Sequence, residues 1–288
     1  MVSERPPLVF SLFFSHKHQY IFVKGGVYMM VGGTPLLNLP GHRILLKMEG
    51  CNPTGSLYDR AIFPMLKGKA EHQKLLLADW GPFALSAAWA AKLLERELEI
   101  WLPEHAPKRF AMKLEQFPCK VKHFNKPLME LRQIAALEDC EILDPWADPE
   151  HPMAYCESLA EELWQQSGGN LSAFVCGTDS CACLMGCSTG LKIKNPDILA
   201  VAAPISLEFC GNHDPLGDAD PEFYVPQLCD MLSYCSLQGA QKAREWLWET
   251  CRIPCGLIGG AALHAALQLE KEISGNIAVI LPSRYDCF

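Results

Sequence analysis

Among the side chains of this sequence that could do acid–base chemistry, we consider Tyr58, Asp79 and Asp179. A phenol can give or take a proton in a reaction, and a carboxylate can do the same. No histidine or lysine is identifiable from the sequence as a partner that would activate the Tyr58 phenol. The sequence therefore favours a Tyr58 that fills space and makes one hydrogen bond. Asp179 precedes a predicted helix and is expected to cap its free N–H groups.

Cysteine is the other reactive residue type, with fourteen in the chain and tight clusters at Cys181, Cys183 and Cys187 and at Cys251 and Cys255. On a helix, residues four apart share a face, but zinc sites usually show paired Cys knuckles around a turn. We therefore predict buried free thiols and no metal site. The nine histidines show no ligand or triad spacing.

The elements that must position these residues alternate between strand and helix, which predicts an α/β fold with parallel sheets covered by helices. Predicted strands are Arg43–Met48, Lys74–Ala78, Leu98–Leu102, Lys120–Phe124, Ala173–Cys176, Leu199–Ala203 and Ile277–Leu281. Predicted helices are Tyr58–Glu71, Pro82–Glu95, Lys108–Gln116, Pro127–Leu137, Pro152–Ser167, Ala182–Lys192, Ala240–Thr250 and Gly260–Ile273. An acidic loop is predicted over Cys210–Pro226.

The segment Glu49–Arg60 (EGCNPTGSLYDR) closely resembles the cofactor-lysine motif of the cysteine synthase and cystathionine beta-synthase family, pyridoxal-phosphate (PLP) enzymes of fold type II. Tyr58 stands where the family's motif has its lysine. Further similar segments follow in the family's order: Gly32–Leu37, His42–Glu49, Trp101–Glu104, Lys194–Pro204, Gly256–Ala262 and Ile277–Ser283. The resemblance implies a two-lobed fold like that of the tryptophan synthase beta subunit, each lobe a mostly parallel sheet flanked by helices. It implies a large lobe of residues 1–49 plus 151–288 and a small lobe of residues 50–150.

The resemblance also locates the family's cofactor contacts, and each of them is altered in this chain. A phenol cannot form the imine that a lysine forms with PLP. Asp179 and Ser180 fall in the phosphate-binding loop, where a carboxylate would repel the phosphate, and Ile258 replaces the serine that contacts the pyridine nitrogen. The substrate loop aligns with Asp79–Ala84, where Trp80, Pro82 and Phe83 replace polar residues. These changes predict a protein that binds no PLP.

Composition limits the remaining possibilities. With 49% hydrophobic residues, 20% charged residues and a formal net charge of −8, the chain suits a globular protein and disfavours nucleic-acid binding. The apolar stretch 9–14 is too short for an export signal and is predicted as a strand. No apolar run reaches membrane-spanning length. We expect a cytoplasmic protein.

The sequence taken alone favours a pseudoenzyme without a cofactor, a binding or scaffold subunit of a protein complex such as a bacterial secretion or transport assembly. A homodimer is expected from the resemblance. The residues expected to line a cleft for a ligand or partner are Asp79, Trp80, Gly81, Phe83, Thr178 and Asp179. Two alternatives stay open: an enzyme with non-PLP chemistry that uses Tyr58, Asp79, Asp179 or a cleft cysteine, and a small-molecule sensor that closes on a ligand.

Overall fold

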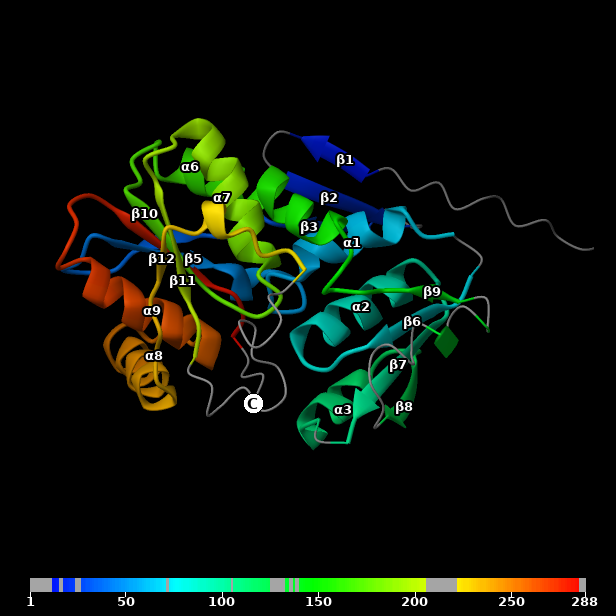
Figure 1. The fold of residues 1–288 in the computed structure, drawn as a ribbon. Helices are drawn as coiled ribbons and strands as arrows, with labels where there is room; N and C mark the ends of the chain where they lie inside the picture. Colours follow the sequence, from blue (N-terminus) through cyan, green and yellow to red (C-terminus); the bar gives the residue numbers. More distant parts are fainter. Residues whose placement is uncertain are drawn as a thin grey trace, which may run out of the picture.

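The computed structural model describes residues 12–15, 18–23, 27–70, 73–104, 106–124, 133–134, 137, 140–205 and 222–284. Its strands form three sheets, of which the two larger ones lie on opposite sides of the molecule (Figure 1). The predicted helix 127–137 and acidic loop 210–226 fall largely outside these residues.

The largest sheet has six strands in the order β12-β11-β10-β13-β5-β4. All neighbouring pairs are parallel except β4 and β5, which are antiparallel. Its inner strands are apolar runs because helices cover both faces, and β13 is buried at every position. The strands are β4 (Leu36–Asn38), β5 (Ile44–Met48), β10 (Ala173–Gly177), β11 (Leu199–Ala203), β12 (Met231–Leu232) and β13 (Ile277–Leu281).

A second, all-parallel sheet has the order β8-β7-β6-β9. It consists of β6 (Leu75–Ala78), β7 (Leu98–Pro103), β8 (Lys120–Phe124) and β9 (Glu141–Ile142). The third sheet is antiparallel, with β1 (Leu12–Ser15), β2 (His18–Val23) and β3 (Val27–Val31). The strand predicted over residues 9–14 is thus present from Leu12, and its earlier residues lie outside the described part of the chain.

The helices agree with the predicted ones in place and differ at their ends. They are α1 (Asp59–Lys67), α2 (Pro82–Leu93), α3 (Lys108–Leu114), α5 (Glu150–Ala154), α6 (Ala160–Gln166), α7 (Ala182–Lys194), α8 (Leu237–Cys251) and α9 (Leu257–Leu269). Short turns lie at η1 (Glu49–Cys51) and η3 (Pro226–Leu228). The predicted helix 152–167 is interrupted by η2 (Tyr155–Leu159), a π-helical turn between α5 and α6.

A buried ion network fixes α1 against the large sheet and α6. Arg60 of α1 donates to Glu49 at 2.6 Å and to Glu162 of α6 at 2.8 Å, and Lys47 of β5 donates to Glu162 at 2.7 Å. Burial raises the pKa of Glu162, but hydrogen bonding and charge from Arg60, together with Lys47, lower it to about 2. Because Arg60 lies two residues beyond Tyr58, this network also fixes the start of α1, next to Tyr58.

The predicted two-lobed α/β class is confirmed by one mostly parallel and one parallel sheet with their covering helices. The predicted lobe boundaries, 1–49 plus 151–288 and 50–150, stay a prediction. Within the described part of the chain, none of the helices combines the length and hydropathy that a bilayer crossing requires.

Candidate functional site

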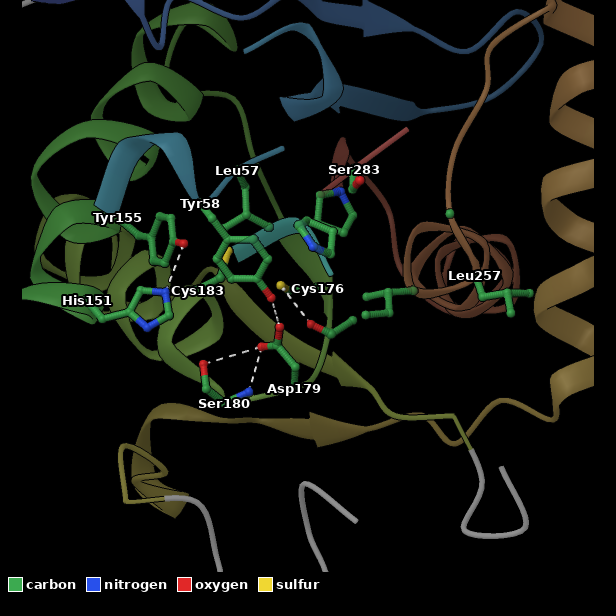
Figure 2. A pocket seen from close by; sticks show the side chains of 15 residues that line it. Leu57, Tyr58, His151, Tyr155, Cys176, Asp179, Ser180, Cys183, Leu257 and Ser283 are labelled. Carbon is green, nitrogen blue, oxygen red and sulfur yellow. Dashed lines mark hydrogen bonds between the residues drawn. The ribbon is translucent and has the colours of Figure 1, made fainter. Parts of the chain in front are cut away.

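Tyr58 lies immediately before α1, and its phenol points toward Asp179 in the pocket (Figure 2). Its O–H donates a hydrogen bond to Oδ2 of Asp179, which follows strand β10. The ring packs edge-on against Phe83 of α2, with the centroids 5.5 Å apart, and lies 5.9 Å from the ring of His151. The space-filling role predicted for Tyr58 stays a prediction, and the hydroxyl bonds to a carboxylate.

Asp179 holds its carboxylate toward Tyr58 by a second hydrogen bond. Its Oδ1 accepts the backbone N–H of Ser180 at 2.6 Å. The predicted helix cap by Asp179 is wrong, because the first N–H of α7, on Ala182, bonds to the hydroxyl of Ser180 at 3.4 Å. Cys181, the residue that precedes the helix, has φ 61° and provides no side-chain cap. The Asp179 carboxylate therefore bonds to the Tyr58 phenol and to the Ser180 N–H, and it does not cap α7.

His151 and Tyr155 complete the polar side of the site. His151 Nδ1 lies 2.7 Å from the carbonyl of Pro145, which can only accept, so Nδ1 carries the hydrogen. Burial lowers the pKa of His151 below its ordinary value, so the ring is neutral at neutral pH. Its Nε2 then accepts the Tyr155 O–H at 3.1 Å. The sequence analysis did not single out these two residues, although they stand four positions apart, a spacing that places side chains on one face of a helix.

These side chains surround a small cavity (Figure 2). All five positions predicted from altered cofactor contacts line it: Tyr58, Pro82, Asp179, Ser180 and Ile258. The cavity has a volume of about 20 Å³, which holds about one water molecule. The five positions that the resemblance implied thus lie around one cavity, and this cavity is too small for more than about one water molecule.

The predicted cleft residues after β6 are arranged differently. Phe83 is buried against Tyr58, whereas Trp80 packs on Phe110 of α3 with the ring centroids 5.9 Å apart. Gly81 adopts φ 91°, a conformation that favours glycine, just before Pro82 begins α2. Asp79, Trp80, Gly81, Phe83 and Thr178 are not among the residues that line the cavity.

Asp79 nevertheless interacts electrostatically with Asp179, which lines the cavity. Burial raises its pKa to about 8, and the charge of Asp179 adds to the rise. Asp79 follows β6 and Asp179 follows β10, so the carboxyl ends of strands from both parallel sheets meet here. Ligands of open α/β proteins bind at such strand ends.

Thr178 adds an unsatisfied polar atom beside Asp179. Its side chain is buried, and its Oγ1 has no hydrogen-bond partner among the described residues.

Among the described residues, no group of three or more His, Cys, Asp or Glu side chains is placed to hold a metal ion.

Comparisons with known proteins agree with this architecture. The family described as "Pyridoxal-phosphate dependent enzyme" matches residues 27–283. Cysteine synthase B of Pseudomonas aeruginosa is 27% identical over 275 residues, covering 87% of this chain and 91% of the relative. The O-acetylserine dependent cystathionine beta-synthase of Bacillus subtilis is 24% identical and covers 89% of this chain and 93% of the relative.

Solved structures share the fold. A hydrogen sulfide-producing enzyme from Fusobacterium nucleatum superposes with a TM-score of 0.78 at 22% identity, covering 88% of this chain and 94% of the other. Cysteine synthase from Entamoeba histolytica superposes with a TM-score of 0.80 at 21% identity, covering 88% of this chain and 87% of the other.

These comparisons correct the functional expectation drawn from the sequence. A pseudoenzyme, cofactor-free and acting as a scaffold, was predicted, but the relatives and structural neighbours named above are cysteine synthases and related enzymes. The prediction equated the loss of a lysine with the loss of activity. It took no account of the other titratable groups that the fold gathers around Tyr58.

Proposed function

The chain belongs to the family of pyridoxal-phosphate dependent enzymes, and on this premise we propose that it is an enzyme whose acid–base pair is the Tyr58 phenol and the Asp179 carboxylate. The observation that carries the proposal is the hydrogen bond from Tyr58 to Asp179, at the edge of a cavity that both residues line. A positioned donor–acceptor pair of this kind transfers protons to and from a bound substrate.

The proposal includes that Tyr58 stands at the position where the family's motif has its Schiff-base lysine. PLP supplies an electron sink when it is bound, but a phenol forms no imine with its aldehyde. The Asp179 carboxylate lies where the family's phosphate loop aligns, and the cavity volume of about 20 Å³ is far below the ~300–1,000 Å³ of small-molecule pockets. The residues around Tyr58 thus do not fit a covalently held PLP, and the proposed step uses the chain's own side chains.

The surroundings of the pair suit proton transfer. His151 is neutral and fixed by Pro145 and Tyr155, so it adds no competing charge beside the phenol. Burial keeps the pKa of Tyr155 well above its ordinary value, and Tyr155 therefore stays a donor to His151. Asp79, with a pKa of about 8, is mostly protonated at neutral pH and leaves Asp179 as the nearby negative charge.

The substrate class follows from the relatives. Their names concern cysteine synthesis and O-acetylserine, and we propose a small amino acid with an O-acyl or sulfur substituent. The closed cavity requires the Tyr58–Asp179 hydrogen bond to open before such a molecule enters. The phenol then meets the substrate's leaving oxygen or sulfur as a proton donor.

The test is turnover of O-acetylserine, with and without sulfide, and of cysteine, followed by release of acetate or sulfide. Tyr58→Phe keeps the ring and removes the acidic hydrogen, and Asp179→Asn keeps the shape and removes the charge. Each is expected to lower kcat/KM by about 10²–10⁴-fold. Wild-type turnover that both variants retain in full would contradict the proposal.

The remaining expectations become part of the same proposal: a cytoplasmic enzyme that forms a homodimer and contacts a protein partner. Size-exclusion chromatography with light scattering checks the dimer. Affinity purification from a cell fraction checks location and partner.

A further inference from the structure

A cluster of three thiols lies beside the cavity and has no part in the proposed acid–base step. Cys176 is near the end of β10, and Cys183 and Cys187 lie one turn apart on α7. All three are buried, with 2%, 6% and 0% of their surface exposed. Cys176 and Cys183 line the cavity, and Cys187 is not among its lining residues (Figure 2).

Hydrogen bonds concentrate negative charge on the central sulfur of the cluster. Hydrogen bonding with Cys176 and then with Cys187 lowers the pKa of Cys183 below its ordinary value, although burial opposes this. The hydrogen bond with Cys183 and burial raise the pKa of Cys176, whose sulfur also lies 3.1 Å from the Gly177 carbonyl oxygen, and burial together with the same kind of bond raises the pKa of Cys187. Cys183 is therefore the most acidic of the three thiols, and thiolates are the nucleophilic form of cysteine.

Helix geometry decides which neighbour can form a disulfide with Cys183. Residues four apart on a helix have Cβ atoms about 5–6 Å apart, whereas a disulfide needs about 3.5–4.5 Å. Cys187 is thus too distant while α7 stays helical. Cys176 lies on β10, outside the helix, and it lines the same cavity as Cys183, so this helix constraint does not apply to it.

We propose that Cys183 and Cys176 form an oxidation site, in which Cys183 reacts with a small hydroperoxide and Cys176 resolves the product. The cavity that both sulfurs line holds about one water molecule, so hydrogen peroxide, the smallest hydroperoxide, is the one that needs the least opening to reach them.

The chemistry balances within the pair and one peroxide. The Cys183 thiolate attacks one peroxide oxygen, the O–O bond breaks, and the departing hydroxide takes a proton from solvent to become water. Cys183 is now a sulfenic acid. The Cys176 sulfur then attacks the Cys183 sulfur, the S–O bond breaks, and the hydroxide leaves with the Cys176 proton as a second water. Both thiols are oxidised to one disulfide, and the peroxide is reduced.

The test treats the reduced full-length protein with increasing hydrogen peroxide, with and without dimedone to trap sulfenic acid, and maps each cysteine by mass spectrometry. Cys51 is exposed and serves as the internal comparison. We expect Cys183 to be consumed about tenfold faster than Cys51, because the thiolate is the reacting form. A peptide that links Cys176 to Cys183 should appear with the loss of both thiol hydrogens.

Two variants separate the roles of the thiols. Cys176→Ser should stop at the sulfenic acid, which dimedone labels at Cys183. Cys187→Ser is the matched control and should still form the linkage between Cys176 and Cys183. Oxidation of Cys51 while Cys183 stays reduced, or a disulfide that joins Cys183 to another residue, overturns the proposal. The wild-type map decides this even where a variant fails to fold.

Discussion

The Tyr58–Asp179 hydrogen bond joins two residues that are 121 positions apart in the sequence. A pair that acts as one catalytic unit gives non-additive effects, since either loss disables both members. We therefore predict that Tyr58→Phe combined with Asp179→Asn lowers kcat/KM no further than the more damaging single change. Steady-state kinetics of the four proteins check this. Losses that multiply would mean that the two residues act separately.

Asp79 makes stability depend on pH in a defined direction. Its folded pKa of about 8 lies above the ordinary value, so the folded protein holds a proton that the unfolded chain has lost. The stability that this proton contributes is complete below about pH 4 and is lost as pH rises toward about 8. Asp79→Asn should remove this dependence and stabilise the fold at about pH 8.5 by on the order of 2 kcal/mol, a value reduced for partial exposure.

Urea denaturation at several pH values measures the effect of Asp79→Asn. Asp59, whose burial raises its pKa to about 6, contributes a slope of the same sign and stays unchanged in both proteins. The difference between the two curves therefore isolates Asp79. Parallel curves across the range would contradict the raised pKa.

At the scale of elements, Gly177 sets how closely β10 approaches the start of α9. A Cβ atom at this position would lie 2.3 Å from Cγ2 and 2.7 Å from the carbonyl oxygen of Ile258. Gly177→Ala must push Ile258 away and should destabilise the fold by about 1–3 kcal/mol. Gly68→Ala is the control, because a Cβ there meets nothing within 4 Å. Thermal unfolding compares them, and equal melting temperatures would show that α9 shifts freely.

The buried ion network makes α1 sensitive to a single change. Arg60→Leu would leave the carboxylates of Glu49 and Glu162 buried with less compensation, which should cost about 3–5 kcal/mol of unfolding free energy. The exposed pair Lys120–Glu97 is the control, and Lys120→Ala should cost about 1 kcal/mol or less. Chemical denaturation measures both. Similar costs would mean that the network adds little.

The elements also show what the sequence could predict. Seven of the eight predicted strands occur within about one residue of their places, because most of these parallel strands are continuous apolar runs. The short strands β4, β9 and β12 were not predicted, since two or three residues carry no periodic pattern, and the antiparallel strands β2 and β3 were not predicted either. The turn η2 has the same helical pattern as its neighbours, so the sequence could not show it. Tyr58, Pro82, Asp179, Ser180 and Ile258 were found by resemblance, whereas His151 was missed because its place beside Tyr58 in the cavity depends on the packing of distant segments.

At the scale of the whole molecule, the two parallel sheets present their strand ends to one site. Tyr58 and Asp179 connect the start of α1 to the loop after β10, and Asp79 follows the end of β6. A substrate larger than one water molecule enters only if these segments separate. The hydrogen bond therefore opposes opening, and its strength sets part of the energy that substrate binding must supply.

Removing this hydrogen bond should change opening more than global stability. In Tyr58→Phe, amide hydrogen exchange should become about five- to tenfold faster in residues 177–184 and 50–58, which corresponds to about 1–1.5 kcal/mol for one hydrogen bond. Helix α8 packs through Ala243 and Leu247 in a hydrophobic cluster that contains neither Tyr58 nor Asp179, so its exchange rate is the internal control. Faster exchange in α8 by the same factor would indicate general destabilisation. Unchanged exchange in both segments would mean that the cleft is held closed by packing of Phe83 and its neighbours, and the opening step would then be independent of the Tyr58–Asp179 pair.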